Sequence, residues 1–425
     1  MLSESLDRLA LLHPKIIDLG LERTYQLLEK AGSPHQNLPP IFHIAGTNGK
    51  GSVSAYLFAI AKQLGLVTHC YTSPHLCRFN ERIRIENKLI DDEALLQVLD
   101  EVEKLNQNRP ITFYEITTVA AFMAFARVPA DLLILETGLG GRLDSTNVIE
   151  NPLASIITPI ARDHEHFLGS ELTQIAGEKA GIIKKNVPII SASQTKEVEE
   201  TLIKKAREMA APIFFEGTDF IWEQISTGEV KLECKNRVFT LPKPALIGPH
   251  QIQNAALAAA SIIYSDNFTP LDDRLFSGIG FAKWPGRVQF IDQGKLLNYR
   301  DARPIWIDGA HNSHGAAALA ASLAQITEEK WTLIAGMLNT RKPDDFFTPL
   351  KNLISEIFTI NIPGQPASLS AQELSDNCQD LGIKSTAKSS LSAALSATSE
   401  SEFVVICGSL YLAGHALLLN DTLPE

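Results

Sequence analysis

Short apolar runs alternate with helical stretches along most of the chain, and this alternation limits the folds available to it. The runs richest in Ile, Val and Leu are Ile41–Ala45, Val67–Tyr71, Asp131–Glu136, Ala154–Ile160 and Val187–Ala192. The amphipathic or small-residue stretches between them are Ser52–Gln63, Asp91–Leu105, Glu115–Ala126 and Leu172–Ile183. Strands that alternate with helices form a mainly parallel sheet covered on both faces. The sequence therefore predicts an α/β fold.

A second alternating series begins after Trp284-Pro285-Gly286. Its predicted strands are Ile305–Ile307, Trp331–Ala335, Ile354–Ile362 and Phe403–Cys407. A chain of 425 residues has room for two or three domains. We predict two, with a boundary between residues 285 and 286. Ahead of that boundary, residues 213–241 predict a few antiparallel strands at one edge of the first sheet, and Ser385–Ser401 is compatible with a helix.

Charge and cysteine content exclude some functions. The net charge is −11, which argues against a general nucleic-acid binder because phosphate backbones require a basic face. The five cysteines show no CxxC spacing, so we expect free thiols in a reducing compartment. No signal peptide is recognisable, and no apolar run reaches the roughly 18–20 residues of a membrane span. We expect a cytoplasmic, monomeric protein with no membrane or nucleic-acid partner.

The strongest local motif is the glycine-rich segment Gly46-Thr47-Asn48-Gly49-Lys50-Gly51-Ser52, which follows a predicted strand and opens a predicted helix. Backbone N–H groups of such a loop cradle phosphates, and a lysine in it reaches the β- and γ-phosphates. Ser52 is placed to offer a hydroxyl to Mg²⁺. One glycine separates Lys50 from Ser52, unlike the strict P-loop pattern. The alternative is a glycine-rich turn with an exposed lysine.

Polar residues also follow other predicted strands, where open α/β sheets place their ligands. Glu136 ends one strand and is a candidate to bind Mg²⁺ or to activate water. Asp163 to His166 follow another, and a solvated charged loop explains them equally well. In the second half of the chain, Asp308 and His311 follow Ile305–Ile307. These positions are candidates for one site or more.

Nine segments, in the same order, resemble the Mur ligase superfamily and, within it, the bifunctional dihydrofolate synthase/folylpolyglutamate synthase family. They are IDLGLER, GTNGKGS, SPHL with FNERI, TFYEITT, ETGLGGRLDSTN, DHxxxLG with EKAGI, GPHQIQNAA, WPGR and DGAHN. The resemblance covers nearly the whole chain. It implies an N-terminal P-loop Mur-ligase-like ATPase domain (1–285) that binds ATP and pterin. It also implies a C-terminal Rossmann-like glutamate-ligase domain (286–425).

The resemblance implies a reaction and its cofactors. ATP phosphorylates a substrate carboxylate, and the amine of L-glutamate attacks the acyl phosphate to give an amide and phosphate. The acceptors are 7,8-dihydropteroate, which becomes dihydrofolate, and tetrahydrofolate, which becomes folylpolyglutamate. Mg²⁺ assists, and a monovalent cation and a carbamate on Lys179 are further groups that the resemblance allows.

The resemblance also assigns residues by motif. The catalytic candidates are Lys50, Glu136, His164, Lys179 and His311. The ATP-binding candidates are Thr47, Asn48, Gly49, Lys50, Gly51, Ser52, Asn254, Arg287 and Asp308. The metal ligands are Ser52, Ser73, Glu136 and His164. The substrate-binding candidates are Asp18, Leu19, Gly20, Thr112, Phe113, Tyr114, Glu115, Leu143, Asp144 and Ser145, with Phe113 suited to stack on a pterin.

Two alternatives remain open at this point. The first is a related ligase with a narrower range, either a folylpolyglutamate synthase alone or a peptidoglycan-type amino-acid ligase. The second is a nucleotide-dependent switch without ligase activity, which shares the phosphate loop but does not need the DGAHN segment of the second domain.

Overall fold

The computed structural model describes residues 2–15, 17–301, 303–398 and 403–425. The chain divides into two compact units. Unit 1 comprises residues 1–75, 79–245 and 252–283, and unit 2 comprises residues 76–78, 246–251 and 284–425. The main division falls between Lys283 and Trp284, next to the boundary that the sequence predicts. The activity assigned to each domain stays a prediction.

A central sheet organises unit 1. Among the described residues it has eight strands in the order β4-β3-β2-β5-β1-β6-β7-β8. The strands are β1 (Ile41–Ala45), β2 (Thr68–Tyr71), β3 (Ile83–Ile85), β4 (Lys88–Leu89), β5 (Leu132–Glu136), β6 (Ala154–Ile157), β7 (Ile189–Ser191) and β8 (Ile213–Phe215). The pairs along β2-β5-β1-β6-β7-β8 are all parallel, whereas the described pairs β2–β3 and β3–β4 are antiparallel. The predicted α/β class with a mainly parallel sheet is confirmed.

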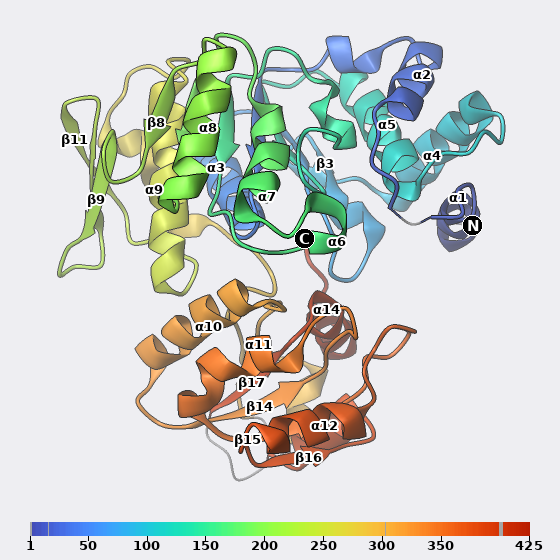
Figure 1. Ribbon diagram of the computed structural model, residues 1–425, viewed down its shortest axis with the longest axis vertical. Coiled ribbons are helices and arrows are strands. Elements are labelled where there is room, and N and C mark those ends of the chain that lie inside the picture. Colours follow the sequence, from blue (N-terminus) through green and yellow to red (C-terminus); the bar gives the residue numbers. More distant parts are fainter. Residues whose placement is uncertain (1, 16, 302, 399–402) are drawn as a thin grey trace. The chain divides into compact units, whose positions relative to one another are not determined.

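Helices cover both faces of this sheet. The described α-helices of this part of the chain are α1 (Leu2–Ala10), α2 (Glu22–Lys30), α3 (Lys50–Gln63), α4 (Asp92–Asn106), α5 (Phe113–Ala126), α6 (Glu165–Leu168), α7 (Leu172–Lys179), α8 (Lys196–Glu208) and α9 (Pro249–Tyr264). Helix α5 is buried almost all round, as its run of apolar residues requires. Helices α7 and α8 lie side by side (Figure 1) and share a core with Ala45 of β1. This packing fixes the strand ends that carry the motifs.

The segment 213–241 differs from the expectation. Strand β8 extends the main sheet in parallel, whereas β9 (Phe220–Gln224), β10 (Val230–Cys234) and β11 (Arg237–Leu241) form a separate antiparallel sheet. The predicted antiparallel edge of the main sheet is therefore wrong. The alternating pattern buries one face of these strands, and there Phe239 of β11 packs edge-on against Phe276, with 5.6 Å between ring centroids.

Unit 2 is a second α/β unit, with strands in the order β12-β13-β17-β14-β15-β16. The strands are β12 (Gln289–Ile291), β13 (Ile305–Ile307), β14 (Trp331–Ala335), β15 (Ile354–Thr359), β16 (Ser385–Ala387) and β17 (Val404–Cys407). The helices are α10 (Ser313–Ile326), α11 (Pro343–Phe347), α12 (Ala371–Asp380), α13 (Leu391–Ser396) and α14 (Leu410–Asn420). Only β12 is antiparallel to its neighbour. The helix considered for Ser385–Ser401 is divided into β16 and α13, and residues 399–402 lie outside the described part.

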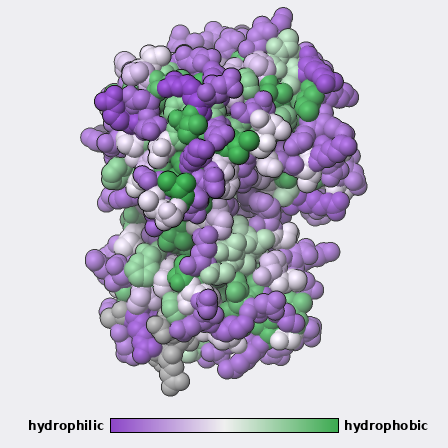
Figure 2. Space-filling view, turned by 90° about the vertical axis from the view of Figure 1, so that its left-hand side faces the viewer, coloured by the Kyte–Doolittle hydropathy of each residue, from purple (hydrophilic) through white to green (hydrophobic). Residues whose placement is uncertain are grey.

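Two features of the whole chain bear on the sequence-based exclusions. Within the described residues, no helix is both long and apolar enough to span a bilayer. All five cysteines are free thiols. Hydrophilic residues cover much of the face shown in Figure 2, where hydrophobic residues form smaller groups between them.

Candidate active site

The order of the strands in unit 1 explains why distant motifs converge. Strands β2, β5, β1 and β6 are consecutive parallel neighbours, so their carboxyl ends lie at one edge of the sheet. Ser73 follows β2, and Glu136 is the last residue of β5. The glycine-rich loop follows β1, and His164 follows β6. The structure thus gathers four of the predicted motifs at this edge.

The glycine-rich loop joins β1 directly to α3, as predicted. Thr47 ties it to the chain after β6, because its N–H donates to the Pro159 carbonyl and its hydroxyl to the Ala161 carbonyl, both at 3.0 Å. Gly49 adopts φ +90°, and a Cβ there would lie 2.7 Å from Oδ1 of Asn254 on α9. Asn254 therefore lies directly against the loop, which agrees with a role at the same ligand.

Two lysines converge on the loop. The Lys50 ammonium donates to the carbonyls of Gly46 and Thr47, at 3.2 and 3.4 Å. The Lys179 ammonium, at the end of α7, donates to the same Gly46 carbonyl at 2.8 Å. Burial and the neighbouring Lys50 charge lower the pKa of Lys179 to about 7. A substantial fraction of the Lys179 side chain is consequently a neutral amine near pH 7.

The predicted metal ligands have the chemistry that Mg²⁺ prefers, except for one imidazole. Glu136 and Ser52 are buried at the sheet edge and at the first turn of α3, and the Ser73 hydroxyl is also buried. His164 lies in the left-handed region with φ 53°, and its side chain is 41% exposed. Across the described part of the chain, no three His, Cys, Asp or Glu residues form a metal cluster. A sparse oxygen donor set fits Mg²⁺, which keeps several waters and takes further oxygens from phosphates.

A second group of predicted residues gathers in unit 2. The Asp308 carboxylate accepts the N–H of Val288 at 2.9 Å and that of Ala310 at 2.8 Å. Burial raises the pKa of Asp308, while the nearby Arg287 opposes that effect. The ring Nδ1 of His311 lies 3.1 Å from the Gly309 carbonyl oxygen. Asp308 and His311 thus follow β13 directly, and Arg287 lies beside them, because a Cβ at Gly309 would meet Nη1 of Arg287 at 2.7 Å.

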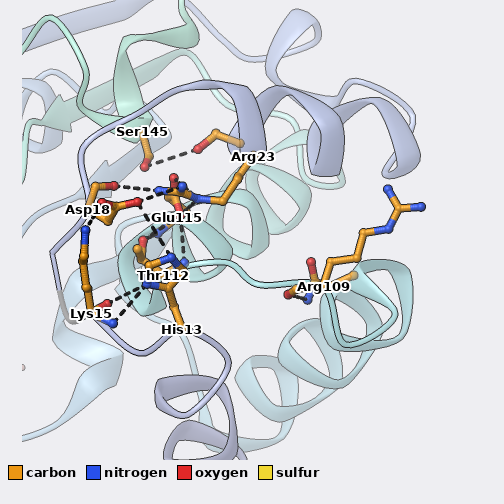
Figure 3. Close-up of polar contacts among 10 residues, drawn as sticks. His13, Lys15, Asp18, Arg23, Arg109, Thr112, Glu115 and Ser145 are labelled. Atoms are coloured by element: carbon orange, nitrogen blue, oxygen red, sulfur yellow. Dashed lines mark hydrogen bonds and ion pairs between the residues drawn. The ribbon is translucent and has the colours of Figure 1, made fainter.

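The predicted pterin-binding segments also converge, around the beginning of α5 (Figure 3). Thr112 is the N-cap of α5, and the capping box is closed by Glu115, whose carboxylate accepts the Thr112 N–H and hydroxyl at 2.8 Å each. Phe113 is the first residue of the helix and packs edge-on against Phe79, 5.7 Å between ring centroids. Tyr114 reaches toward Asp144, at 3.5 Å.

Both carboxylate oxygens of Asp144 accept hydrogen bonds. Its Oδ2 accepts the N–H groups of Gly138 and Leu139, both at 2.9 Å. Its Oδ1 accepts the Thr146 N–H at 3.0 Å and the Thr146 hydroxyl at 2.6 Å. Burial raises the pKa of Asp144, whereas these donors stabilise its ionised form. Asp144 therefore holds the loop after Glu136 in shape.

Sequence reasoning gave no role to two residues that contact the predicted site residues or their neighbours, His43 and Arg23. His43 of β1 contacts the Thr146 hydroxyl at 2.9 Å, and burial lowers the pKa of His43 to about 3. Because the Thr146 hydroxyl donates to Asp144, it accepts from a neutral His43 ring. Arg23 lies within the IDLGLER motif but received no role. Two signals could have identified these residues. His43 is a polar residue in an otherwise apolar strand, and Arg23 is an arginine in the first turn of a helix.

Two family models match this chain. The Mur ligase middle domain matches residues 44–262, and the C-terminal domain of dihydrofolate synthetase matches residues 296–419. The first match spans the phosphate loop, the strand-end residues and Asn254. Together with the site geometry, the matches define the chain as an ATP-dependent ligase of the Mur type.

Relatives narrow this class. The chain is 35% identical to the dihydrofolate synthase/folylpolyglutamate synthase of Bacillus subtilis, over 92% of this chain and 93% of that one. The structure of Escherichia coli FolC in complex with DHPP and ADP matches with a TM-score of 0.88 at 28% identity, covering 99% of this chain and 97% of that one. The Yersinia pestis bifunctional enzyme complexed with AMPPNP and Mn ion matches with a TM-score of 0.87 at 30% identity, covering 98% and 97%. The chain belongs to the dihydrofolate synthase/folylpolyglutamate synthase family, and its activity is ATP-dependent ligation of glutamate to folates.

Proposed function

We propose that this chain uses one site for both ligations, adding L-glutamate to 7,8-dihydropteroate and to tetrahydrofolate through an acyl phosphate. The observation that carries the proposal is that unit 1 contains both the phosphate loop and the three segments of the predicted pterin site, residues 18–20, 112–115 and 143–145. A nucleotide switch would need the phosphate loop but not the three pterin segments. The carboxylate oxygen attacks the γ-phosphorus and ADP leaves. The glutamate amine then attacks the acyl carbon, and phosphate and one proton leave.

The phosphate loop binds ATP in this proposal. Backbone N–H groups of residues 48–52 face the phosphates, and Lys50 turns from its own loop carbonyls to the β- and γ-phosphates. The position of Asn254 against Gly49 supports its contact with ATP. Arg287 and Asp308 are further proposed ATP contacts, and His311 is proposed to act on the transferred phosphate.

A divalent cation accompanies ATP, with Ser52, Ser73, Glu136 and His164 as its protein ligands. When bound, it neutralises charge on the phosphates and on the developing acyl phosphate. The buried carboxylate of Glu136 and the buried hydroxyls of Ser52 and Ser73 support this assignment. A monovalent cation is a further proposed component.

Lys179 is proposed to carry a carbamate. Its neutral amine adds to CO₂, which forms an N–C bond and releases one proton, so that the neutral side chain becomes an anion. Burial of the amine and its pKa of about 7 support this step, because only the neutral amine is nucleophilic. The carbamate anion would attract the Lys50 ammonium, whereas a Lys179 ammonium repels it.

The pterin acid is bound by Asp18 to Gly20, Thr112 to Glu115 and Leu143 to Ser145. Phe113 offers a ring for stacking. Asp144 serves this site chiefly by shaping the loop of Gly138 and Leu139. We also propose that the protein works as a cytoplasmic monomer without nucleic-acid or membrane partners, in keeping with its net charge of −11.

The proposal is tested by phosphate release from the purified protein with Mg²⁺-ATP and L-glutamate. One reaction contains 7,8-dihydropteroate, a second contains tetrahydrofolate, and a third contains no acceptor. We expect acceptor-dependent release in the first two. Release with tetrahydrofolate alone would restrict the chain to folylpolyglutamate synthesis, and release without an acceptor would favour a nucleotide switch.

A further inference from the structure

Arg23 makes contacts that no motif assignment explains. It lies in the first turn of α2, and its side chain is 28% exposed. Its Nε donates to both carboxylate oxygens of Glu115, at 2.9 and 3.1 Å. Its Nη1 donates to the Asp18 carboxylate at 2.9 Å, and its Nη2 to the Asp18 backbone carbonyl at 2.7 Å (Figure 3). One guanidinium therefore connects Asp18 with Glu115, which lies 92 residues after Arg23 in sequence.

The Glu115 end of this connection is buried. The Glu115 side chain is only 4% exposed, and its carboxylate also accepts the Thr112 N–H and hydroxyl that form the N-cap of α5. A buried carboxylate is costly unless a cation or several donors satisfy it. Arg23 supplies the cation, and Thr112 supplies the neutral donors. The conformation of residues 112–115 therefore depends on Arg23.

The Asp18 end is more open. The Asp18 side chain is 32% exposed and also contacts Lys15 at 3.3 Å. Contacts with Lys15 and Arg23 lower the pKa of Asp18. The backbone carbonyl of Asp18 is the firmer anchor, because it fixes the chain immediately before Leu19 and Gly20. The neighbour of Arg23 in α2, Thr24, is buried and reaches the Ser145 hydroxyl at 3.5 Å. The first turn of α2 thus contacts all three proposed pterin-binding segments.

We propose that Arg23 is a positioning residue for the pterin acid. Its guanidinium acts as a clamp that holds the segments 18–20 and 112–115 together as one binding surface. This inference rests on the proposed function of those segments. It assigns the Glu115 carboxylate to the clamp, so that the substrate meets backbone groups and Phe113 there. Lysine replaces the clamp only in part, since it has one ammonium in place of a planar fork with several donors.

The test compares Arg23→Met and Arg23→Lys with the control Arg127→Met. Arg127 lies at the other end of α5 and pairs with Glu101 at 2.6 Å, with both side chains more than two-fifths exposed. We expect Arg23→Met to raise the KM for 7,8-dihydropteroate by about 10- to 100-fold, while the KM values for ATP and L-glutamate change by less than about threefold. Arg23→Lys should lie between Arg23→Met and the wild type, and Arg127→Met should resemble the wild type.

Equal rises in all three KM values, or a loss confined to kcat, would overturn the inference. If Arg23→Met fails to fold, the double variant Arg23→Met/Glu115→Gln removes the unpaired buried charge, and it must show the same selective loss of dihydropteroate binding. Arg23→Lys gives an independent measure in a chain that keeps its charge. Failure of the proposed function itself is distinguishable, because the wild-type protein would then release no phosphate in response to the pterin acid.

Discussion

Replacing Gly49 by alanine tests whether the loop and Asn254 form one rigid ATP site. An L-residue at φ +90° costs about 1–2 kcal/mol relative to glycine. The new Cβ would also lie 2.7 Å from Asn254 Oδ1, well inside van der Waals contact. The side-chain or backbone shifts that such overpacking forces destabilise the protein by a further ~1–3 kcal/mol. Because the loop or the buried Asn254 side chain must shift to relieve it, we expect the contact to weaken ATP binding as well as stability.

Gly65 provides a matched control at the other end of α3. Its φ is +76°, but a Cβ there would meet nothing within 4 Å. Gly65→Ala therefore carries the backbone cost without the contact. If the ~1–3 kcal/mol of the Asn254 contact is lost from the free energy of ATP binding, the KM for ATP rises by about 5- to 150-fold in Gly49→Ala. It should change by less than about twofold in Gly65→Ala.

The assay is steady-state ADP formation at varied ATP, with thermal unfolding of both variants measured in parallel. Gly49→Ala should unfold at a lower temperature than Gly65→Ala, and saturating ATP should narrow the difference in rate. Equal KM values for ATP in the two variants would refute the reasoning, because they would show that contact with Asn254 does not restrain the loop.

The remaining predictions concern charge at the site. Lys50→Ala should lower kcat by at least about 10²–10³-fold in ADP formation, because it removes the cation at the transferred phosphate; near-wild-type kcat would contradict this. Glu136→Gln should raise the Mg²⁺ concentration needed for half-maximal rate, and an unchanged Mg²⁺ titration would count against Glu136 as a ligand. At fixed dissolved CO₂, the neutral fraction of Lys179 rises with pH through its pKa of about 7. Enzyme stripped of CO₂ should therefore regain activity about tenfold faster at pH 8 than at pH 6, and a ¹³C carbamate signal should be absent from Lys179→Arg; equal reactivation at both pH values would argue against the carbamate.

The parts of the fold that sequence could predict are those with local signals. The apolar runs predicted β1, β5 and β6, and the glycine-rich loop between β1 and α3 was expected from seven consecutive residues. The convergence of Ser73, Glu136 and His164 at one sheet edge follows from parallel strands. The order of those strands was not available from spacing, because it depends on packing between distant segments.

Other parts depend on contacts that a linear pattern does not contain. Residues 213–241 predicted antiparallel strands at one edge of the main sheet. The pattern does not show which element covers their apolar face, so the separate sheet of β9 to β11 was missed. The motif containing Arg23 was recognised, whereas its partner Glu115 was identifiable only in three dimensions. The same holds for His43 beneath Thr146, because a buried histidine in a strand gives no indication of the group that it supports.

Transfer of oxygen from the pterin acid to phosphate tests the central claim most directly. The carboxylate of 7,8-dihydropteroate is labelled with ¹⁸O and turned over with Mg²⁺-ATP and L-glutamate. Phosphoryl transfer to that carboxylate predicts one ¹⁸O atom in each inorganic phosphate released, since the C–O bond of the acyl phosphate breaks when the amine attacks. Unlabelled phosphate would contradict an acyl phosphate and, with it, the account of how this site works.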